Sequence, residues 1–376
     1  MEVNYVAMAI PFFLISMGLE IIVSLKSKHK LYRFNDTIAN LSNGLGQQAT
    51  GIIFKVFYFY CYTYVYNNWS LIKLDESSPF VWMLAILIGD LSYYWFHRAS
   101  HRINLLVGCH AVHHHSEEYN LSVAMRQSWF TRTYSWIFYL PLAIIGISPL
   151  NFIAVGAIVL IYQFWVHTQY IGKLGFLEKI LVTPSHHRVH HGRNPEYVDK
   201  NYGAIFIWWD KLFGTFSEEK ETVVYGVLNP VNSWNPLYGN FKYYTHLWRE
   251  MKQTTSLKEK FQLWFMPPEW RASNLTPYGD IPNVTPQSIK KYDVHRTGAI
   301  NLWIVFHFTI SFALLGVILF LGKEWTLAHK AFGILLIVMG LTTIGAIQEK
   351  RTWRYAGQAI FFLSTFSFVY FSFIKF

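Results

Sequence analysis

The sequence predicts an all-α integral membrane protein, a multi-span helical bundle of about eight spans, and three observations support this fold class. Hydrophobic residues make up 52% of the 376 residues and charged residues only 14%, whereas a soluble domain carries about 25% charged residues. Several apolar runs approach the roughly 20 residues that a bilayer span needs. The excess of 32 Lys and Arg over 22 Asp and Glu lies beside these runs, as on a cytosolic membrane face. In a nucleic-acid-binding protein this charge would lie on a polar domain, so we expect no nucleic-acid partner.

The first apolar run, residues 5–25, is followed by four basic residues and has no cleavage site, so it reads as a retained anchor. Residues 134–170 are long enough for two crossings, with a turn at Ser148-Pro149. The remaining expected spans are residues 51–66, 79–96, 299–321, 331–347 and 358–373.

Four regions follow from this pattern. They are N-terminal spans (residues 1–78), a histidine-rich catalytic core (79–216), a polar cap (217–297) and C-terminal spans (298–376). The basic loops place the N-terminus outside and the histidines on the cytosolic face. The membrane would be the endoplasmic reticulum in a eukaryote and the inner membrane in a bacterium.

Histidine is the unusual residue of this chain, because eleven of the sixteen lie between residues 97 and 191. They form the motifs HRASH (97–101), HAVHH (110–114) and HRVHH (187–191), and His167 stands alone at the inner end of a span. Residues i, i+3 and i+4 of a helix share one face, about 5–6 Å apart. Two imidazoles at this spacing can reach one metal ion at about 2.0–2.1 Å each. We therefore expect the rings within each motif to point the same way: His97 with His101, His110 with His113 and His114, and His187 with His190 and His191.

The three motifs supply eight ligands, and His167 would supply a ninth. One tetrahedral site needs four, so this number predicts two metal ions with positions left open for substrate or oxygen. Imidazole suits zinc, copper, iron and nickel alike, but the excess of ligands at a membrane interface indicates redox chemistry on a lipid. His115 and His186 break the facing pattern, and their role as ligands stays open. The other histidines are expected to be ordinary side chains: His29, His246, His295, His307 and His329.

Acidic residues near the motifs are candidates for supporting roles. Asp90 falls on one helical stripe with His97 and His101 and is costly inside an apolar span unless it has a partner. We expect it to orient His97 or a neighbouring ligand, or else to pair with a basic group at the membrane edge. Asp210 is a weaker candidate for the same role. Glu117 and Glu118 follow the second motif as metal neighbours, proton relays or parts of a solvated loop, whereas Glu20 is expected to be structural.

The histidine motifs and their flanks resemble those of the fatty acid hydroxylase/sterol desaturase superfamily of integral-membrane di-iron enzymes. The longer stretches resemble its alkylglycerol monooxygenase-like branch, strongly over about residues 80–230. The stretches concerned are HAVHHHSEEYNLSVAMRQS (110–128), YYWFHR (93–98), YQFWVHT (162–168), TPSHHRVHHGRN (183–194), DKNYG (199–203) and WDKLFGTF (209–216).

This resemblance implies two iron ions, which zinc can replace in recombinant samples, with oxygen as co-substrate and tetrahydrobiopterin as the electron donor. It implies hydroxylation of a membrane lipid at the carbon next to the ether oxygen of an alkylglycerol, which gives fatty aldehyde and glycerol. It also implies that Glu117 matches an active-site glutamate. Its iron ligands would be the eight motif histidines, His97, His101, His110, His113, His114, His187, His190 and His191.

The chain also departs from the family. His115 stands where the family tends to have serine, and no pterin-contact motif is readable, so residues that bind the cofactor stay unassigned.

Three alternatives remain. A fatty acyl or sterol hydroxylase or desaturase belongs to the same superfamily. A histidine-based metal transporter or sensor predicts polar residues through several spans, where Asp90 and Glu20 are the only strong examples. A haem electron-transfer bundle needs facing histidines in mid-membrane, whereas these lie at span ends. The natural substrate, the reductant and the oligomeric state are left open by the sequence.

Overall fold

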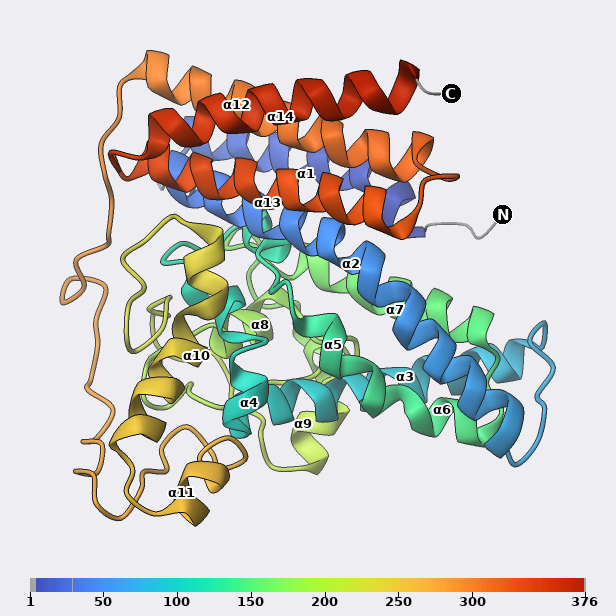
Figure 1. The fold of residues 1–376 in the computed structure, drawn as a ribbon. Helices are drawn as coiled ribbons and strands as arrows, with labels where there is room; N and C mark the ends of the chain where they lie inside the picture. The colour runs from blue at the N-terminus through green and yellow to red at the C-terminus, as the bar shows by residue number, and fades with distance from the viewer. Residues whose placement is uncertain (1–4, 29, 375–376) are drawn as a thin grey trace.

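The computed structural model describes residues 5–28 and 30–374, and the regular elements among them are helices (Figure 1). In this part of the chain, extended backbone pairs only at two isolated bridges, Leu181 with Phe206 and Gly192 with Tyr225. The expectation of an all-α chain is therefore confirmed.

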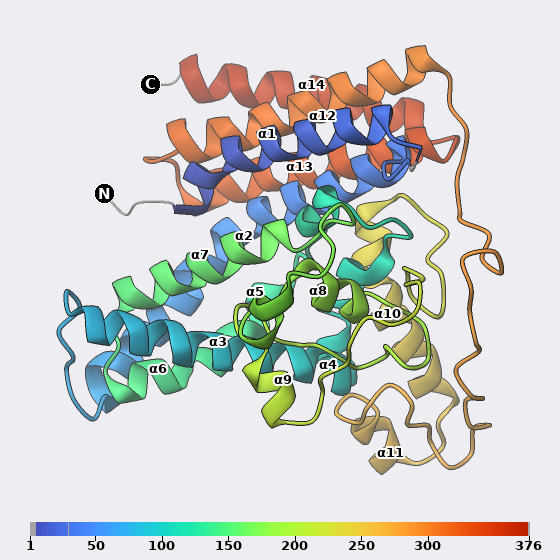
Figure 2. The same ribbon diagram turned by 180° about the vertical axis from the view of Figure 1, so that it is seen from behind.

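The upper layer of the molecule holds four long helices that run side by side (Figures 1 and 2). Among them α13 is central, since it packs against α12, α14 and the first half of the long helix α2. Gly340 permits this close packing, because a Cβ there would lie 2.6 Å from the Phe361 ring and 2.7 Å from Ser311 Oγ. The four helices are α1 (Tyr5–Lys26), α12 (Gly298–Gly316), α13 (Leu327–Gln348) and α14 (Arg354–Ile374).

The lower layer contains the second half of α2 (Phe34–Trp69) with α3 (Pro79–Arg102), α6 (Leu140–Ile145) and α7 (Pro149–Trp165). Proline starts both α3 and α7, where its missing N–H costs nothing. Tyr62 of α2 stacks on Phe152 of α7 with ring centroids 4.1 Å apart. This core fixes the directions of α3 and α7, and both helices end near the histidines.

Within the described residues, five helices are long and apolar enough to cross a membrane, and each coincides with an expected span. They are Met8–Lys26, Pro79–Arg102, Gly298–Leu321, Leu327–Gln348 and Arg354–Phe373. The expected span 51–66 is part of α2 and does not meet this criterion. Residues 134–170 do not form two full-length crossings, because the first half breaks into α5 (Thr131–Ser135), η3 (Trp136–Tyr139) and α6. α7, with 17 residues, is about 26 Å long at 1.5 Å per residue.

Backbone geometry explains the break in residues 134–170. Pro141 lies in the first turn of α6, and this helix ends at Gly146 with φ +97°. That left-handed conformation suits glycine, and a Cβ there would lie 1.9 Å from the carbonyl oxygen of Ile72. The chain therefore turns after six helical residues of α6.

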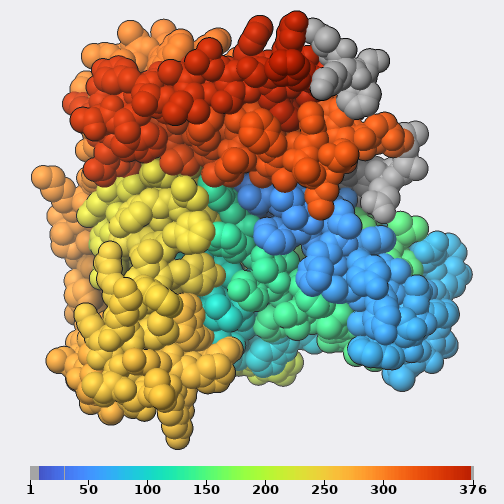
Figure 3. All heavy atoms as spheres, in the orientation of Figure 1, coloured from blue at the N-terminus to red at the C-terminus, as the bar shows by residue number. Residues whose placement is uncertain are grey.

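The polar region after residue 216 forms a cap beneath the C-terminal helices (Figure 3). It contains α10 (Pro236–Gln253) and α11 (Leu257–Gln262), and then an extended segment, residues 277–297, that climbs along the edge of the molecule to α12. We call this segment the strap. The remaining short elements are α4 (Asn104–Val107), η1 (Ala111–His115), η2 (Leu121–Met125), η4 (Gly175–Lys179), α8 (Pro184–His190), α9 (Trp208–Leu212) and η5 (Val317–Leu321).

Candidate metal centre

Nine histidines from four parts of the chain converge in two adjoining groups. In each group, the nitrogen atoms that could bind a metal ion all lie within 4.8 Å of one another. We call them the five-histidine group (His97, His101, His110, His114 and His190) and the four-histidine group (His113, His167, His187 and His191). These are the eight motif histidines and His167.

The groups divide the motifs in a way that differs from the expectation. In HAVHH, His110 and His114 enter the five-histidine group while His113 enters the other group. In HRVHH, His187 and His191 stay together while His190 crosses over. On the α-helix α8 the positions i and i+4 lie about 40° apart, whereas i+3 lies about 100° from i+4. HRVHH therefore spans both groups instead of pointing one way, and HAVHH, which lies on the 3-10 helix η1, is divided between the groups as well.

His115 and His186, whose role as ligands the sequence left open, lie outside both groups. His186 belongs to the capping box that starts α8, where its Nδ1 accepts a hydrogen bond from the Thr183 N–H at 3.3 Å. His115 lines a separate cavity, and its buried Nδ1 has no hydrogen-bond partner. Among the remaining histidines, His246 contacts Tyr278 and His329 contacts Ser372, as ordinary side chains do. His29 lies outside the described residues.

Backbone carbonyls orient four of the converging rings. The Nδ1 atoms lie 2.7–3.0 Å from these oxygens, which places the proton on Nδ1 and leaves the Nε2 lone pair facing inward. The pairs are His97 with Tyr202 O (2.8 Å), His113 with Arg126 O (3.0 Å), His167 with Gln163 O (2.7 Å) and His190 with Lys200 O (2.9 Å).

The inward nitrogens are spaced as ligands of a shared ion would be. Nε2 of His110 lies 2.9 Å from that of His97 and 3.1 Å from that of His114. Nε2 of His167 lies 3.3 Å from that of His113 and 3.1 Å from that of His187. Nitrogens bound at about 2.0–2.1 Å to one ion in tetrahedral or octahedral geometry lie about 2.9–3.4 Å apart. The spacing therefore fits one ion in each group.

Burial keeps these imidazoles in the form that binds metal. Desolvation by burial lowers the pKa of His113, His114 and His191 well below the usual value, and neighbouring histidines lower it further. Nε2 of His101, His190 and His191 is buried without a hydrogen-bond partner. Buried lone pairs without partners cost free energy, and a metal ion in each group would satisfy them. The residues present thus fit a pair of metal ions.

Asp199 is a supporting residue that the sequence reasoning missed. Its Oδ1 lies 3.7 Å from His101 Nδ1, and Arg102 holds the other carboxylate oxygen. A carboxylate behind a histidine ligand fixes the orientation of the ring. Asp199 lies in the DKNYG stretch, and no spacing in the sequence links it to His101, which is 98 positions earlier.

Asp90 does not make the direct contact expected for it. Its carboxylate accepts hydrogen bonds from Ile205 N (2.8 Å), Phe206 N (3.0 Å) and Trp209 Nε1 (2.9 Å). His97 instead bonds to the carbonyl of Tyr202. The alternative, a basic partner, is also not found: the three donors are two backbone N–H groups and an indole N–H. The reason is geometric: the segment after residue 199 lies between Asp90 and the rings.

Asp210 binds the same segment, and residues of that segment separate it from the five-histidine group. It accepts hydrogen bonds from Tyr202 N (2.7 Å), Gly203 N (2.8 Å) and Thr215 Oγ1 (2.7 Å). Burial raises the pKa of this carboxyl, while those hydrogen bonds lower it. Asp210 therefore supports His97 through the backbone of Tyr202 and touches no histidine ring itself in these contacts.

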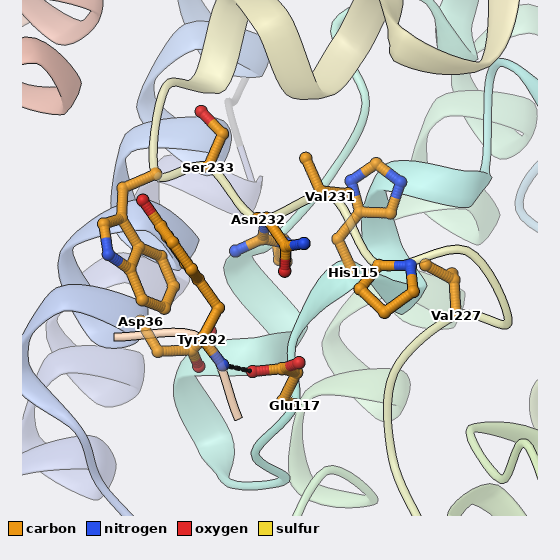
Figure 4. Close-up of a pocket in the computed structure, with 11 residues that line it drawn as sticks. Asp36, His115, Glu117, Val227, Val231, Asn232, Ser233 and Tyr292 are labelled. Carbon is orange, nitrogen blue, oxygen red and sulfur yellow. Dashed lines mark hydrogen bonds between the residues drawn. The ribbon is translucent and has the colours of Figure 1, made fainter. Parts of the chain in front are cut away.

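Glu117 lies on the cap side and outside the two histidine groups. Its Oε2 accepts hydrogen bonds from Tyr292 N (2.8 Å) in the strap and Arg33 NH2 (3.3 Å). It lines a cavity of about 20 Å³ together with Asp36 and His115 (Figure 4). This volume holds about one water molecule. Glu117 thus faces a polar cavity of its own.

Glu118 and Glu20 have structural partners. Glu118 pairs with Arg33 (2.5 Å) and with Lys291 of the strap (2.8 Å), so it fastens the strap to the core. Burial raises the Glu118 pKa, and Lys291 and Arg33 oppose this effect. Glu20 of α1 accepts hydrogen bonds from Leu121 N (2.8 Å) and Thr168 Oγ1 (2.5 Å), next to His167. Glu20 therefore ties the first helix to the residues next to His167 of the four-histidine group.

Comparison with known proteins agrees with this geometry. The fatty acid hydroxylase family model matches residues 82–215, which contain all nine converging histidines. Alkylglycerol monooxygenase of Xenopus tropicalis is 38% identical over 351 residues, 93% of this chain and 78% of that protein. The human alkylglycerol monooxygenase is 37% identical over 359 residues with the same shares. Ornithine lipid hydroxylase OlsE of Rhizobium tropici is 27% identical over 144 residues, 36% of this chain and 41% of that protein. No solved structure matches.

Proposed function

We propose that this chain, which belongs to the fatty acid hydroxylase family, is a membrane di-iron monooxygenase that acts on the alkyl chain of an ether lipid. One observation carries the metal assignment: nine buried or half-buried histidines converge as a group of five and a group of four with their inward nitrogens about one ligand spacing apart. The relatives named alkylglycerol monooxygenase support the substrate class.

In this proposal the ligands are the eight motif histidines and His167. The chain's own contribution is to hold neutral rings in place through the carbonyls of residues 126, 163, 200 and 202. Two bound iron ions would supply the activation of oxygen for attack on a C–H bond. Iron rather than zinc follows from the redox reaction, since zinc has no redox chemistry.

The reaction inserts one oxygen atom into the C–H bond next to the ether oxygen. The second oxygen atom leaves as water, with two electrons and two protons from a donor for which we propose tetrahydrobiopterin. The adjacent ether oxygen weakens this C–H bond. The hydroxylated product is a hemiacetal, which breaks into a fatty aldehyde and glycerol when the hydroxyl proton passes to the leaving oxygen.

Glu117 is the proposed active-site glutamate. It comes three residues after His114, is buried, and opens into a polar cavity with His115 and Asp36 (Figure 4). A carboxylate there can take up and release a proton between the cap and the site. Residues 79–216 form the catalytic core in this proposal, and residues 217–297 cover it.

We also propose eight membrane passes with the histidines on the cytosolic face. α1 begins and α14 ends at the same side of the molecule (Figure 1), as an even number of passes requires. The five candidate spans supply five passes, and α2, the α5–α6 segment and α7 supply the other three. The four basic residues after the apolar run 5–25 favour the cytosol for the histidine side. In a eukaryote the membrane would be the endoplasmic reticulum, and in a bacterium the inner membrane.

The test is aldehyde release from a defined lipid. Membranes that contain the protein are incubated with an alkylglycerol, oxygen and reduced tetrahydrobiopterin, and fatty aldehyde is measured with His113→Ala as control. We expect aldehyde from the unchanged protein and none from the variant. Well-folded, iron-loaded protein that releases no aldehyde would remove the ether-cleaving assignment, and equal turnover by His113→Ala would remove the metal assignment.

A second candidate function is hydroxylation of an acyl chain, which the match to the fatty acid hydroxylase family model favours. The same incubation with an ester lipid separates the two. A hydroxylated acyl chain without aldehyde would support this candidate.

A further inference from the structure

A patch of exposed apolar side chains lies outside the long helices, on η4 and α9. Phe176 is 68% exposed and Leu212 69% exposed, far above what a side chain in a core shows. An apolar patch of this kind marks a surface that contacts a membrane or a partner. We call it the η4–α9 surface; its members are Phe176, Leu177, Trp208, Leu212 and Phe216.

Backbone pairing joins η4 and α9 into one unit. Leu181 bridges Phe206, Val182 N donates to Ile205 O at 2.8 Å, and Ile207 N donates to Ile180 O at 3.1 Å. Lys211 of α9 donates to the carbonyl of Lys179 at the end of η4 at 3.1 Å. Since the two elements are hydrogen-bonded at several points, their exposed side chains form a single surface.

This surface lies beside a membrane-spanning helix rather than beyond its end. Trp209 of α9 donates to Asp90 of α3 at 2.9 Å, and Phe213 packs on Trp95 with ring centroids 4.9 Å apart. The expected apolar span ends at residue 96, so position 95 lies at its inner end and position 90 lies about 9 Å deeper at 1.5 Å per residue. Figures 1 and 2 both place α9 next to α3 on the side away from α12–α14. The surface is therefore level with the inner part of α3.

Basic residues surround the apolar centre. Lys179 and Lys211 are exposed, and the Lys211 ammonium lies over the Phe216 ring at 5.2 Å. Lys173 is exposed as well, but it is paired with Glu218 at 2.6 Å. Apolar and aromatic side chains with a lysine rim are the signature of an element that lies in the membrane interface. Lysines at that depth attract the anionic headgroups of the cytoplasmic leaflet.

We propose that the η4–α9 surface rests in the headgroup region of the inner leaflet, with phospholipid as its partner. The continuity with Trp95 of α3, which is itself 42% exposed, identifies the partner as the bilayer that α3 spans. Phe176 and Leu212 reach the upper acyl region, about 5–10 Å below the surface, while the lysines stay with the headgroups. This contact goes beyond the proposed reaction and does not depend on it.

The η4–α9 surface is also connected to the five-histidine group by two hydrogen bonds. Asp210 on α9 holds Tyr202 N, and the Tyr202 carbonyl faces His97 Nδ1. The lipid surface and the five-histidine group therefore share one supporting segment, residues 202–210.

Depth-dependent quenching tests the proposal on the full-length protein. Cys61 and Cys109 are replaced by alanine, single cysteines are introduced as Leu212→Cys, Leu363→Cys and Asn283→Cys, and each is labelled with the fluorophore NBD. Leu363 on α14 is the matched leucine, with the same 69% exposure on a candidate span. Asn283 is an exposed position in the strap. The proteins are placed in nanodiscs of phosphatidylcholine and phosphatidylglycerol that carry a doxyl quencher at acyl carbon 5 or 12.

We expect the label at position 212 to be quenched more by 5-doxyl than by 12-doxyl lipid. The label at 363 should respond more strongly to 12-doxyl lipid, and the label at 283 to neither. Phe176→Cys gives the same reading from η4 if Leu212→Cys fails to fold. A label at 212 and 176 that is as unquenched as that at 283 would overturn the proposal. A disulfide between two Leu212→Cys chains would do so as well, since it would assign the surface to a second copy.

Discussion

The five-histidine and four-histidine groups adjoin, but the chain supports them differently. The five-histidine group takes two ligands from α3 and rests on the segment 199–202, with Asp199 behind His101. The four-histidine group takes His167 from the end of α7 and rests on the carbonyls of residues 126 and 163. The five-histidine group has one histidine more than the four that a tetrahedral site needs, whereas the four-histidine group has no extra histidine.

This difference teaches that the two ions, if bound as proposed, should differ in how easily they are lost. The three-histidine motifs connect the groups, since His114 of one stacks on His191 of the other with ring centroids 4.4 Å apart. A substitution in either ring changes packing to a similar extent. The consequences for metal content should still differ, because only the five-histidine group retains four ligands.

The largest effect is expected for His191→Ala, with His114→Ala as its matched control. His191→Ala leaves three ligands in its group, so the metal content should fall by about half and the activity by more than about 100-fold. His114→Ala leaves four ligands and should retain both ions. Elemental analysis of the purified proteins measures the metal content, and equal losses in the two variants would refute the difference between the groups.

A smaller effect is expected for Arg126→Gln, which removes a support of the four-histidine group. Arg126 is buried, and its side chain donates to Val112 O (2.8 Å) and Asn40 Oδ1 (2.9 Å) while its carbonyl faces His113. We expect metal affinity in that group to fall by up to about 100-fold, and Arg126→Lys to restore part of it. Metal competition with a chelator gives the affinity. Loss of the other ion first would show that Arg126 acts elsewhere.

The equivalent change in the five-histidine group is Asp199→Asn. This substitution removes the negative charge near His101 but keeps a side chain of the same size that can accept a hydrogen bond. The group would also still have four other histidines. We expect about a 10-fold loss of metal affinity in that group. The same chelator competition measures it. An effect as large as that of His191→Ala would mean that Asp199 is itself part of the site.

The smallest effect is expected outside both groups, for Lys291→Ala in the strap. Its ion pair with Glu118 leaves the lysine 47% exposed, so it contributes about 0–1 kcal/mol. We expect unchanged metal content and faster cleavage within residues 277–297 in limited proteolysis. Loss of either ion would show that the strap directly supports one of the two histidine groups.

Much of the site could be predicted because helical spacing is local. The positions of the nine histidines in the sequence anticipated which side chains meet, and five of the expected spans coincide with helices that are long and apolar enough to cross a membrane. The division of each motif was not predictable, since His113 and His190 turn to opposite groups only when η1 and α8 face each other. Asp90 illustrates the same limit: its stripe on α3 was read correctly, but the segment that fills the space beside it comes from residues 205–209.

The sequence by itself determined that the chain is helical, that apolar helices of bilayer length flank a histidine-rich core, and which histidines form its motifs. These properties depend on composition and on periodicity within one helix. The tertiary structure decided how the rings divide between two groups, which backbone carbonyls and which aspartate hold them, and where Glu117 faces. Those outcomes depend on contacts between segments up to about 175 residues apart, such as Glu117 with Tyr292, and helical periodicity carries no information over such separations.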